Sequence, residues 1–130
     1  MSVALLMMSF YFGVSGNHAT TKPLKSWEGQ LDNVKYESHP AFVIDQKQWN
    51  LVWKKWSTEE VPTVDFNKEM VLVFSTIGAN SITVKPIIRD QEGNLRVMAI
   101  YTLQLSKGVS YKWLLIPRAG VKSVNTIRIK

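Results

Sequence analysis

The spacing of apolar residues predicts one amphipathic helix over residues 45–56. Asp45 is a favourable N-cap residue, and Gln48 three positions later completes a capping-box pattern. An aromatic row at helical spacing usually packs inward, so we expect the tryptophans of this segment to be core; a partly exposed ligand platform is the alternative. The apolar residues at positions i, i+3, i+4 and i+7, which share one helix face, are Trp49, Val52, Trp53 and Trp56.

Most of the remaining chain reads as short strands separated by turns. Residues 69–77 form a continuous apolar run, which is typical of a strand buried on both faces. Pro86 lacks an N–H group and belongs at an edge or a bulge. Consecutive hairpins predict an antiparallel sheet of about six strands with one main helix packed on a face, an α+β fold. The other expected strands cover residues 41–44, 82–90, 95–105, 111–116 and 124–130, with a weaker candidate at 30–38.

The N-terminal residues 3–14 form an uncharged apolar run. The run is too short to cross a bilayer core of about 30 Å at about 1.5 Å per residue. It fits the apolar region of a secretory signal peptide, and the small residues that follow allow cleavage after Gly16 or Ala19. Because no Lys or Arg precedes the run, a structural strand or an anchor is the alternative.

These features predict three parts in the chain. Residues 1–19 are assigned to a signal peptide, residues 20–40 to a polar lead-in segment, and residues 41–130 to a single α+β domain. We therefore expect an exported protein of the periplasm or cell envelope, with membrane contact only through the N-terminal segment if that segment is not cleaved.

Composition narrows the chemistry. The absence of cysteine excludes disulfides, thiolate zinc sites and a cysteine nucleophile. The net charge is +6, yet the basic residues are scattered from Lys22 to Lys130, and the longest block is the pair Lys54–Lys55. Scattered charge is typical of a solvated surface, so we do not expect nucleic-acid binding.

Candidate catalytic and metal-binding residues are few. His39 has no second histidine or carboxylate at metal-ligand spacing, and we interpret it as a loop residue. No Gly-x-Ser-x-Gly elbow accompanies it, so a serine triad has no local support. The acidic residues from Glu59 to Glu69 lack the spacing of a calcium loop and are interpreted as solvated loop charge. We expect no enzymatic activity, no metal and no cofactor.

Several motifs together resemble a known family. The segments are the tryptophan helix with Trp49, Trp53 and Trp56, Val-Asp-Phe-Asn-Lys-Glu-Met-Val-Leu-Val-Phe at 64–74, Asp-x-Glu-Gly-Asn-Leu-x-Val at 90–97 and Tyr-x-x-x-x-Ile-Pro at 111–117. Over residues 42–117 the chain resembles the C-terminal domain of the PrcB-type protease-complex accessory subunits and related small exported bacterial proteins. The resemblance implies a non-catalytic domain that associates with or stabilises another protein.

The chain departs from that family after the strand at 69–77. The family usually has a Gly-Gly-Tyr-like segment there, whereas this chain has Gly78, Ala79, Asn80 and Ser81. We take these four residues as the candidate contact with a protein partner of unknown identity, and no active-site residue carries over. The alternative function is a carbohydrate- or polyanion-binding module that uses exposed tryptophans and basic residues.

Overall fold

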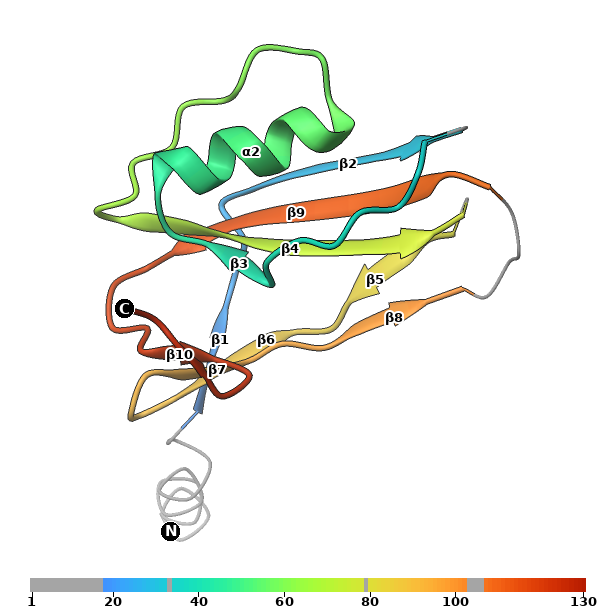
Figure 1. The fold of residues 1–130 in the computed structure, drawn as a ribbon. Helices are drawn as coiled ribbons and strands as arrows, with labels where there is room; N and C mark the ends of the chain where they lie inside the picture. The colour runs from blue at the N-terminus through green and yellow to red at the C-terminus, as the bar shows by residue number, and fades with distance from the viewer. Residues whose placement is uncertain (1–17, 33, 79, 103–106) are drawn as a thin grey trace, which may run out of the picture.

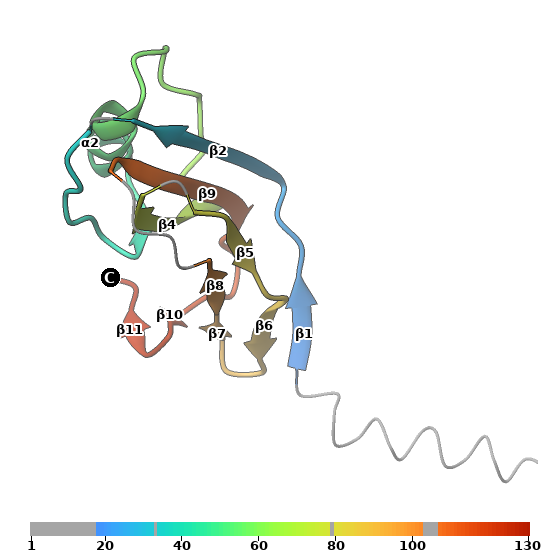
Figure 2. The ribbon, with the colours of Figure 1, turned by 90° about the vertical axis from the view of Figure 1, so that its right-hand side faces the viewer.

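A computed structural model describes residues 18–32, 34–78, 80–102 and 107–130 of the chain. The helix α2 (Gln46–Trp56) covers one face of a four-stranded antiparallel sheet, and a second sheet packs against the other face (Figures 1 and 2). The α+β class with one main helix is thus confirmed for the described residues. The single six-stranded sheet is wrong, because the strands divide among three sheets of four, five and two strands.

The four-stranded sheet holds the long strands at its centre. Its two central strands pair over nine residues each, and their side chains alternate between the two faces. Val71 and Val73 face the helix, whereas Met70 and Leu72 face the second sheet, so residues 70–73 are buried on both faces as predicted. The strand order is β2 (Lys25–Leu31), β9 (Val109–Pro117), β4 (Glu69–Ile77) and β3 (Phe42–Val43).

The helix forms as its sequence predicts. The Asp45 carboxylate accepts a hydrogen bond from the Gln48 N–H group at 2.8 Å, which satisfies one of the free donors at the helix start. The tryptophan face packs on the central sheet, where Trp113 of β9 is completely buried. The core interpretation of the tryptophans is confirmed. The helix residues buried in this layer are Trp49, Val52, Trp53 and Trp56.

The second sheet closes the other side of the core. Its inward residues Ile87, Leu95 and Val124 meet the even-numbered residues of β4 and β9. This layer includes a parallel neighbour pair, β7 with β10, in an otherwise antiparallel arrangement. The strand order is β1 (His18–Thr21), β6 (Ile87–Asp90), β7 (Asn94–Arg96), β10 (Ser123–Val124) and β11 (Ile127–Arg128).

A bent hairpin connects this sheet to a third, two-stranded one. The predicted strand 82–90 is interrupted at Lys85 and Pro86, since proline cannot donate a ladder hydrogen bond. The returning strand, predicted over 95–105, is interrupted at Val97 and Met98, and its residues 103–106 lie outside the described part of the chain. The outer half of the hairpin is the pair β5 (Ile82–Val84) and β8 (Ala99–Tyr101).

The predicted lead-in segment 20–40 is also corrected. β1 pairs with β6, and β2 pairs with β9 over seven residues, so nine of the 21 residues of this segment belong to the sheets. β2 was not predicted because its sequence lacks a clear apolar alternation. Trp27 and Leu31 pack against the helix-side core, and the residues between them are polar or glycine. The weak strand predicted over 30–38 ends at Leu31, and residues 34–40 are irregular.

The two chain ends complete the comparison. Residues 1–17 of the predicted signal peptide lie outside the described residues, whereas His18 and Ala19 belong to β1. The terminal strand predicted over 124–130 is instead the short hairpin β10–β11. Asn125 and Thr126 make its turn with φ of 47° and 73°, the left-handed backbone that a two-residue hairpin turn requires.

Candidate functional site

The predicted partner-contact residues lie in the turn that joins β4 to β5. Gly78 adopts φ of 90°, and its N–H group donates to the Gly108 carbonyl at 2.7 Å. Asn80 is only 4% exposed, and its side-chain amide donates to the Ile77 carbonyl at 2.7 Å. Ala79 lies outside the described residues. Gly78 and Asn80 are therefore bonded into the framework of the fold.

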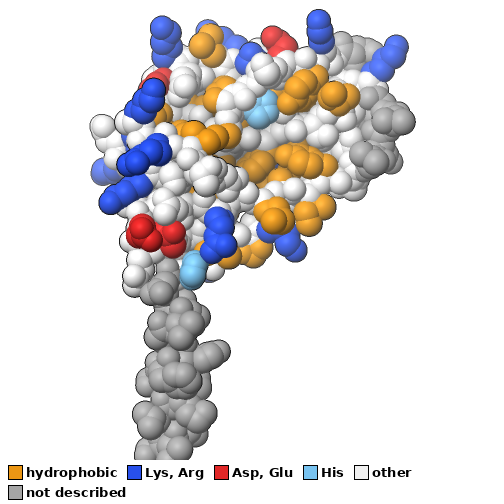
Figure 3. Space-filling model, turned by 60° about the horizontal axis from the view of Figure 1, so that its bottom comes forward, with side chains coloured by type: hydrophobic (Ala, Val, Ile, Leu, Met, Phe, Trp, Pro, Cys, Tyr) orange, Lys and Arg blue, Asp and Glu red, His pale blue; other side chains and the backbone are white. Residues whose placement is uncertain are grey.

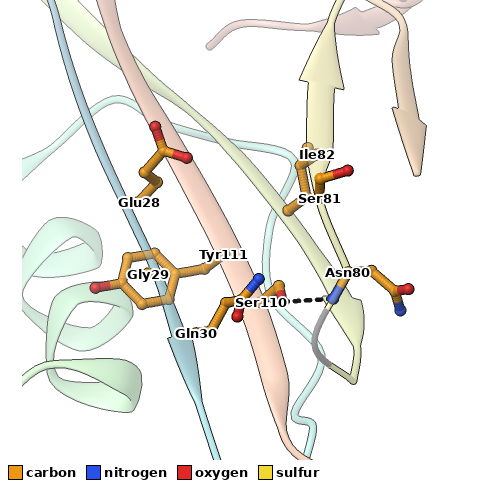
Figure 4. Close-up of a pocket in the computed structure, with 8 residues that line it drawn as sticks. All are labelled: Glu28, Gly29, Gln30, Asn80, Ser81, Ile82, Ser110 and Tyr111. Atoms are coloured by element: carbon orange, nitrogen blue, oxygen red, sulfur yellow. Dashed lines mark hydrogen bonds between the residues drawn. The ribbon is translucent and has the colours of Figure 1, made fainter. Parts of the chain in front are cut away.

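Two hydroxyl groups complete the framework of this turn. The Ser110 hydroxyl accepts from the Asn80 N–H group at 3.0 Å and donates to the Gly78 carbonyl at 2.7 Å, as Figure 4 shows in part. The Thr102 hydroxyl accepts from the Ser81 N–H group at 2.9 Å and donates to the Asn80 side-chain carbonyl at 3.1 Å. Asn80 thus positions the turn, and Ser81 is its exposed member.

The turn stands at the head of a groove, which we name the β5 groove. It consists of two hollows that follow β5 on the side away from β8. The first hollow has a volume of about 250 Å³ and receives residues from β2, β9 and the turn (Figure 4). Its lining residues are Glu28, Gly29, Gln30, Asn80, Ser81, Ile82, Ser110 and Tyr111.

The second hollow lies next to the first along the sheet, because Lys112 in its wall is the cross-strand neighbour of Glu28 in the first. Its volume is about 320 Å³, and its floor is mainly apolar. The chain between β1 and β2 forms one wall, and the bend between β5 and β6 forms the other. Its lining residues are Thr20, Thr21, Lys22, Pro23, Val84, Lys85, Pro86, Ile87, Lys112 and Leu114.

The charges of the β5 groove are unbalanced. Lys22, Lys85 and Lys112 line the second hollow, and its lining includes no acidic residue. Glu28 is the one acidic residue of the first hollow. Within the described parts of the chain, the salt bridge present joins Lys55 to Glu37 and involves none of the three groove lysines. The groove therefore offers three ammonium groups to an anionic ligand.

The backbone of β5 adds a second kind of binding group. Successive residues of an antiparallel strand direct their N–H and C=O groups to opposite sides. Ile82 and Val84 therefore direct theirs away from β8, towards the groove, where the described residues supply no strand partner. The bonds that fix this alternation are Lys85 N–H to the Met98 carbonyl, 2.8 Å, and Thr102 N–H to the Ser81 carbonyl, 3.2 Å.

Tyr111 lines the first hollow, but its side chain packs against the core on the helix side of the sheet. The Tyr111 ring packs over Gly29, where a Cβ atom would stand 2.7 Å from the phenol oxygen, so a larger residue would displace the ring. Burial raises the pKa of Tyr111, and nearby Glu59 raises it further. Tyr111 is thus a neutral, stacked residue of the core boundary and not a base.

His39 has a partner that the sequence did not reveal. It lies in an irregular segment, as predicted, but its Nε2 atom is 2.5 Å from the Ser75 hydroxyl oxygen. Its Nδ1 atom is 2.8 Å from the Pro40 carbonyl oxygen, which is where a serine triad would have a carboxylate. With Nδ1–H donating to that carbonyl, Nε2 accepts from Ser75. The pair ties residues 34–40 to β4.

The tryptophans, the acidic residues and the helix provide no further binding site among the described residues. Trp49, Trp53, Trp56 and Trp113 are at most 5% exposed, so they offer no platform for sugars or bases. No cluster of three or more His, Asp or Glu side chains in the described residues has the geometry to hold a metal ion. The described helix is too short and too polar to cross a bilayer.

Sequence reasoning missed the β5 groove, although it selected the turn at its head. Comparison with known proteins found no matching family model and no significantly similar curated protein or solved structure. The resemblance to the accessory-subunit family therefore stays a prediction.

Proposed function

We propose that this chain is a non-catalytic, protein-binding accessory domain whose β5 groove receives an extended, acidic segment of another protein. The observation that carries the proposal is a strand edge that opens into a groove lined by three lysines. A peptide that adds a strand to a sheet edge gains affinity from main-chain hydrogen bonds and specificity from side chains at alternate positions.

The position of β1 supports strand addition. β1 pairs with β6 in an antiparallel register that ends at Thr21 opposite Ile87. After Thr21 the chain turns away from β6 and forms β2. The residues that precede β6 form the bend and, before it, β5 (Figure 2). A bound segment that pairs with Ile82 and Val84 would continue the line of β1. The groove thus has room for one strand at the place where the chain's own strand ends.

The charge of the groove selects the chemistry of the partner. Carboxylates on the bound segment would meet Lys22, Lys85 and Lys112, whereas basic segments would be repelled. Each exposed pair is worth roughly 0.2–1 kcal/mol, so the three pairs together contribute about threefold to 150-fold in affinity. Ile87 and Leu114 in the floor would receive one apolar side chain.

Anionic glycans are the alternative ligand. The tryptophans are buried and do not support this alternative, whereas the three groove lysines do. A flexible polyanion would use the lysines but would not need the β5 backbone. The substitution Val84→Pro separates the two, because it removes an N–H group that points to the groove and leaves the β5–β8 bonds in place. Loss of binding in this variant is expected for a peptide strand and not for a glycan.

The test is selection from a displayed library of random peptides, followed by affinity measurement for the enriched peptides at low and high salt. We expect sequences rich in Asp and Glu that bind in extended form. The triple variant Lys22→Gln, Lys85→Gln, Lys112→Gln should weaken binding by about tenfold and reduce its salt dependence. Val84→Pro should abolish binding.

The matched control is the triple variant Lys47→Gln, Lys54→Gln, Lys130→Gln, which removes the same net charge from exposed positions away from the groove. Equal weakening in both triple variants would show that only overall charge matters. Heparin fragments that bind with an affinity unaffected by Val84→Pro would replace the protein-binding proposal by the glycan alternative. If neither probe binds the wild-type groove, the proposal fails.

Export remains part of the proposal and gains a constraint from β1. Cleavage after Ala19 would remove the residues that pair with Asp90 and Arg89, whereas cleavage after Gly16 leaves β1 complete. We therefore favour a mature chain that begins at Asn17. Intact-mass measurement of the native envelope protein tests this, and a mature chain that retains Met1 would contradict export by cleavage.

A further inference from the structure

The other edge of the same hairpin is also open. β8 pairs with β5 on one side, and the described residues place no strand on its other side. β7, which precedes β8 in the chain, pairs with β10 as far as Leu95, and the next residue bonded on that side is Val97. There the Asn125 side chain accepts from the Val97 N–H group at 2.8 Å and donates to its carbonyl at 2.9 Å, in the manner of a backbone partner. Beyond Asn125, none of the described strands pairs with the edge of β8.

The residues of this edge lack the usual protection. Exposed edge strands are normally blunted by charged residues, proline or a bulge. Residues 97–102 read Val-Met-Ala-Ile-Tyr-Thr, with no charge and no proline. Met98 is 63% exposed and Ile100 is 51% exposed. In the space-filling view of the lower side of the molecule, apolar side chains gather in the middle of the face, with most Lys and Arg around them (Figure 3).

Tyr101 adds no charge to the row at neutral pH. Its partial burial raises its pKa above the ordinary value, and nearby Tyr36 raises it further. The edge is therefore an uncharged strip on a chain with a net charge of +6. Two copies of this chain would repel each other at most surfaces, whereas this strip brings no like charges together. A second copy is thus the occupant whose chemistry fits the edge without a further assumption.

The backbone alternation fixes how two copies would meet. Ile100 lies between the two bonded ends of the β5–β8 pairing, so Ala99 and Tyr101 direct their N–H and C=O groups outward. An antiparallel pair of identical strands would then join Ala99 of one copy to Tyr101 of the other by two hydrogen bonds. Ile100 would stand opposite Ile100 of the second copy, on the twofold axis.

We infer that the chain self-associates through β8, as an antiparallel twofold dimer centred on Ile100, in which two two-stranded sheets become one of four strands. A twofold interface uses the same surface on both copies, as this strip allows. A two-stranded sheet is marginally stable by itself, so the added strands also stabilise the hairpin. The interface lies on the opposite edge from the β5 groove, so it stands or falls independently of the proposed protein partner.

The test uses the absence of cysteine in the chain. In a non-hydrogen-bonded antiparallel pair the Cα atoms are about 4.5 Å apart, within the range that a disulfide spans. The variant Ile100→Cys should form a disulfide dimer under mild oxidation at micromolar concentration. The control is Ile127→Cys on β11, which has nearly the same exposure, 52% against 51%, and should stay monomeric.

Sedimentation velocity of the full mature chain gives a second readout. We expect a concentration-dependent monomer–dimer equilibrium for the wild type, and a monomer at all concentrations for Ile100→Lys, with an unchanged circular dichroism spectrum. A wild-type chain that stays monomeric would overturn the inference, and so would Ile100→Cys and Ile127→Cys variants that form disulfides at equal rates. Dimerisation that persists in Ile100→Lys would place the interface elsewhere and also overturn it.

Discussion

The two halves of the bent hairpin differ in what lies beside them. In the inner half, β1 pairs with β6 and β10 pairs with β7, so both edges are covered. In the outer half, β5 and β8 pair only with each other among the described residues. One continuous piece of chain therefore serves as framework at one end and presents two open strand edges at the other.

Burial follows the same division. Ile87 and Leu95 of the inner half are at most 2% exposed and pack into the core between the sheets. Met98 and Ile100 of the outer half are more than half exposed. Since folding does not require those side chains to be apolar, binding is the simplest account of them. Both surfaces that we propose for binding, the β5 groove and the β8 edge, therefore belong to the outer half.

The largest effect is expected from the same truncation made in each half. Ile87→Ala should lower the free energy of unfolding by about 2–5 kcal/mol, because it leaves a cavity in a packed core. Ile100→Ala should lower it by less than about 1 kcal/mol, because that side chain is exposed in the monomer. Urea unfolding of both variants at low protein concentration measures the difference. Equal losses would contradict the division of the hairpin.

The next effect concerns the tie between the outer half and β4. Asn80→Ala removes bonds to the Ile77 carbonyl and to the Thr102 hydroxyl inside the fold, and should cost about 1–3 kcal/mol of stability. Ser81→Ala is the control, because Ser81 is exposed and bonds to Thr102 through its backbone N–H and carbonyl groups, which alanine keeps. Urea unfolding measures both. If Asn80→Ala were as mild as the control, the turn would not be a framework element.

A smaller effect is expected where the covered edge ends. Asn125→Ala removes the two side-chain bonds to Val97 and places alanine at φ of 47°, so we expect a loss of about 1–2 kcal/mol. Asn125→Gly removes the same bonds without the backbone strain and should lose less. The denaturant midpoints of the two variants separate these contributions. No loss in either variant would show that Asn125 does not close the edge of β7.

The elements that could be predicted from the sequence are those whose signals are local, whereas the pairing of distant strands could not be predicted. The helix and the strand at 69–77 were predictable because their signals are local: a cap, a helical aromatic row and a continuous apolar run. The whole hairpin was predicted as two long strands, 82–90 and 95–105, since alternation gives no information about which neighbours a strand has. Pro86 indicated the bend, and the pairing of β1 and β10 on one side of it carries no sequence signature.

The β5 groove was out of reach for the same reason. Its lysines come from the end of β1, the bend after β5 and the middle of β9, and each is an isolated basic residue in the sequence. Only the turn at 78–81 was selected, through a family resemblance that the comparisons leave as a prediction. Asn80 is a buried framework residue of that turn, and the contact of the turn with a partner stays a prediction.

The last prediction concerns the turn that closes the inner half. The Asp90 carboxylate accepts from the N–H groups of Glu92 and Asn94, both at 2.9 Å, and from the Asn94 side-chain amide at 3.0 Å. These bonds, led by the Asn94 N–H group, hold the pKa of Asp90 below its ordinary 3.8. Since the folded pKa is the lower one, this stabilisation is complete above pH 3.8 and is lost as the pH falls through the folded pKa.

The variant Asp90→Asn should therefore show a smaller fall in urea midpoint than the wild type when the pH is lowered from 7 to about 3. Glu60→Gln, an exposed loop residue, is the control and should leave the fall unchanged. The turn belongs to the covered half, so Asp90→Asn introduced beside Ile100→Cys should not alter the rate of disulfide dimer formation at neutral pH. A coupled change in that rate would mean that the two halves of the hairpin do not act separately.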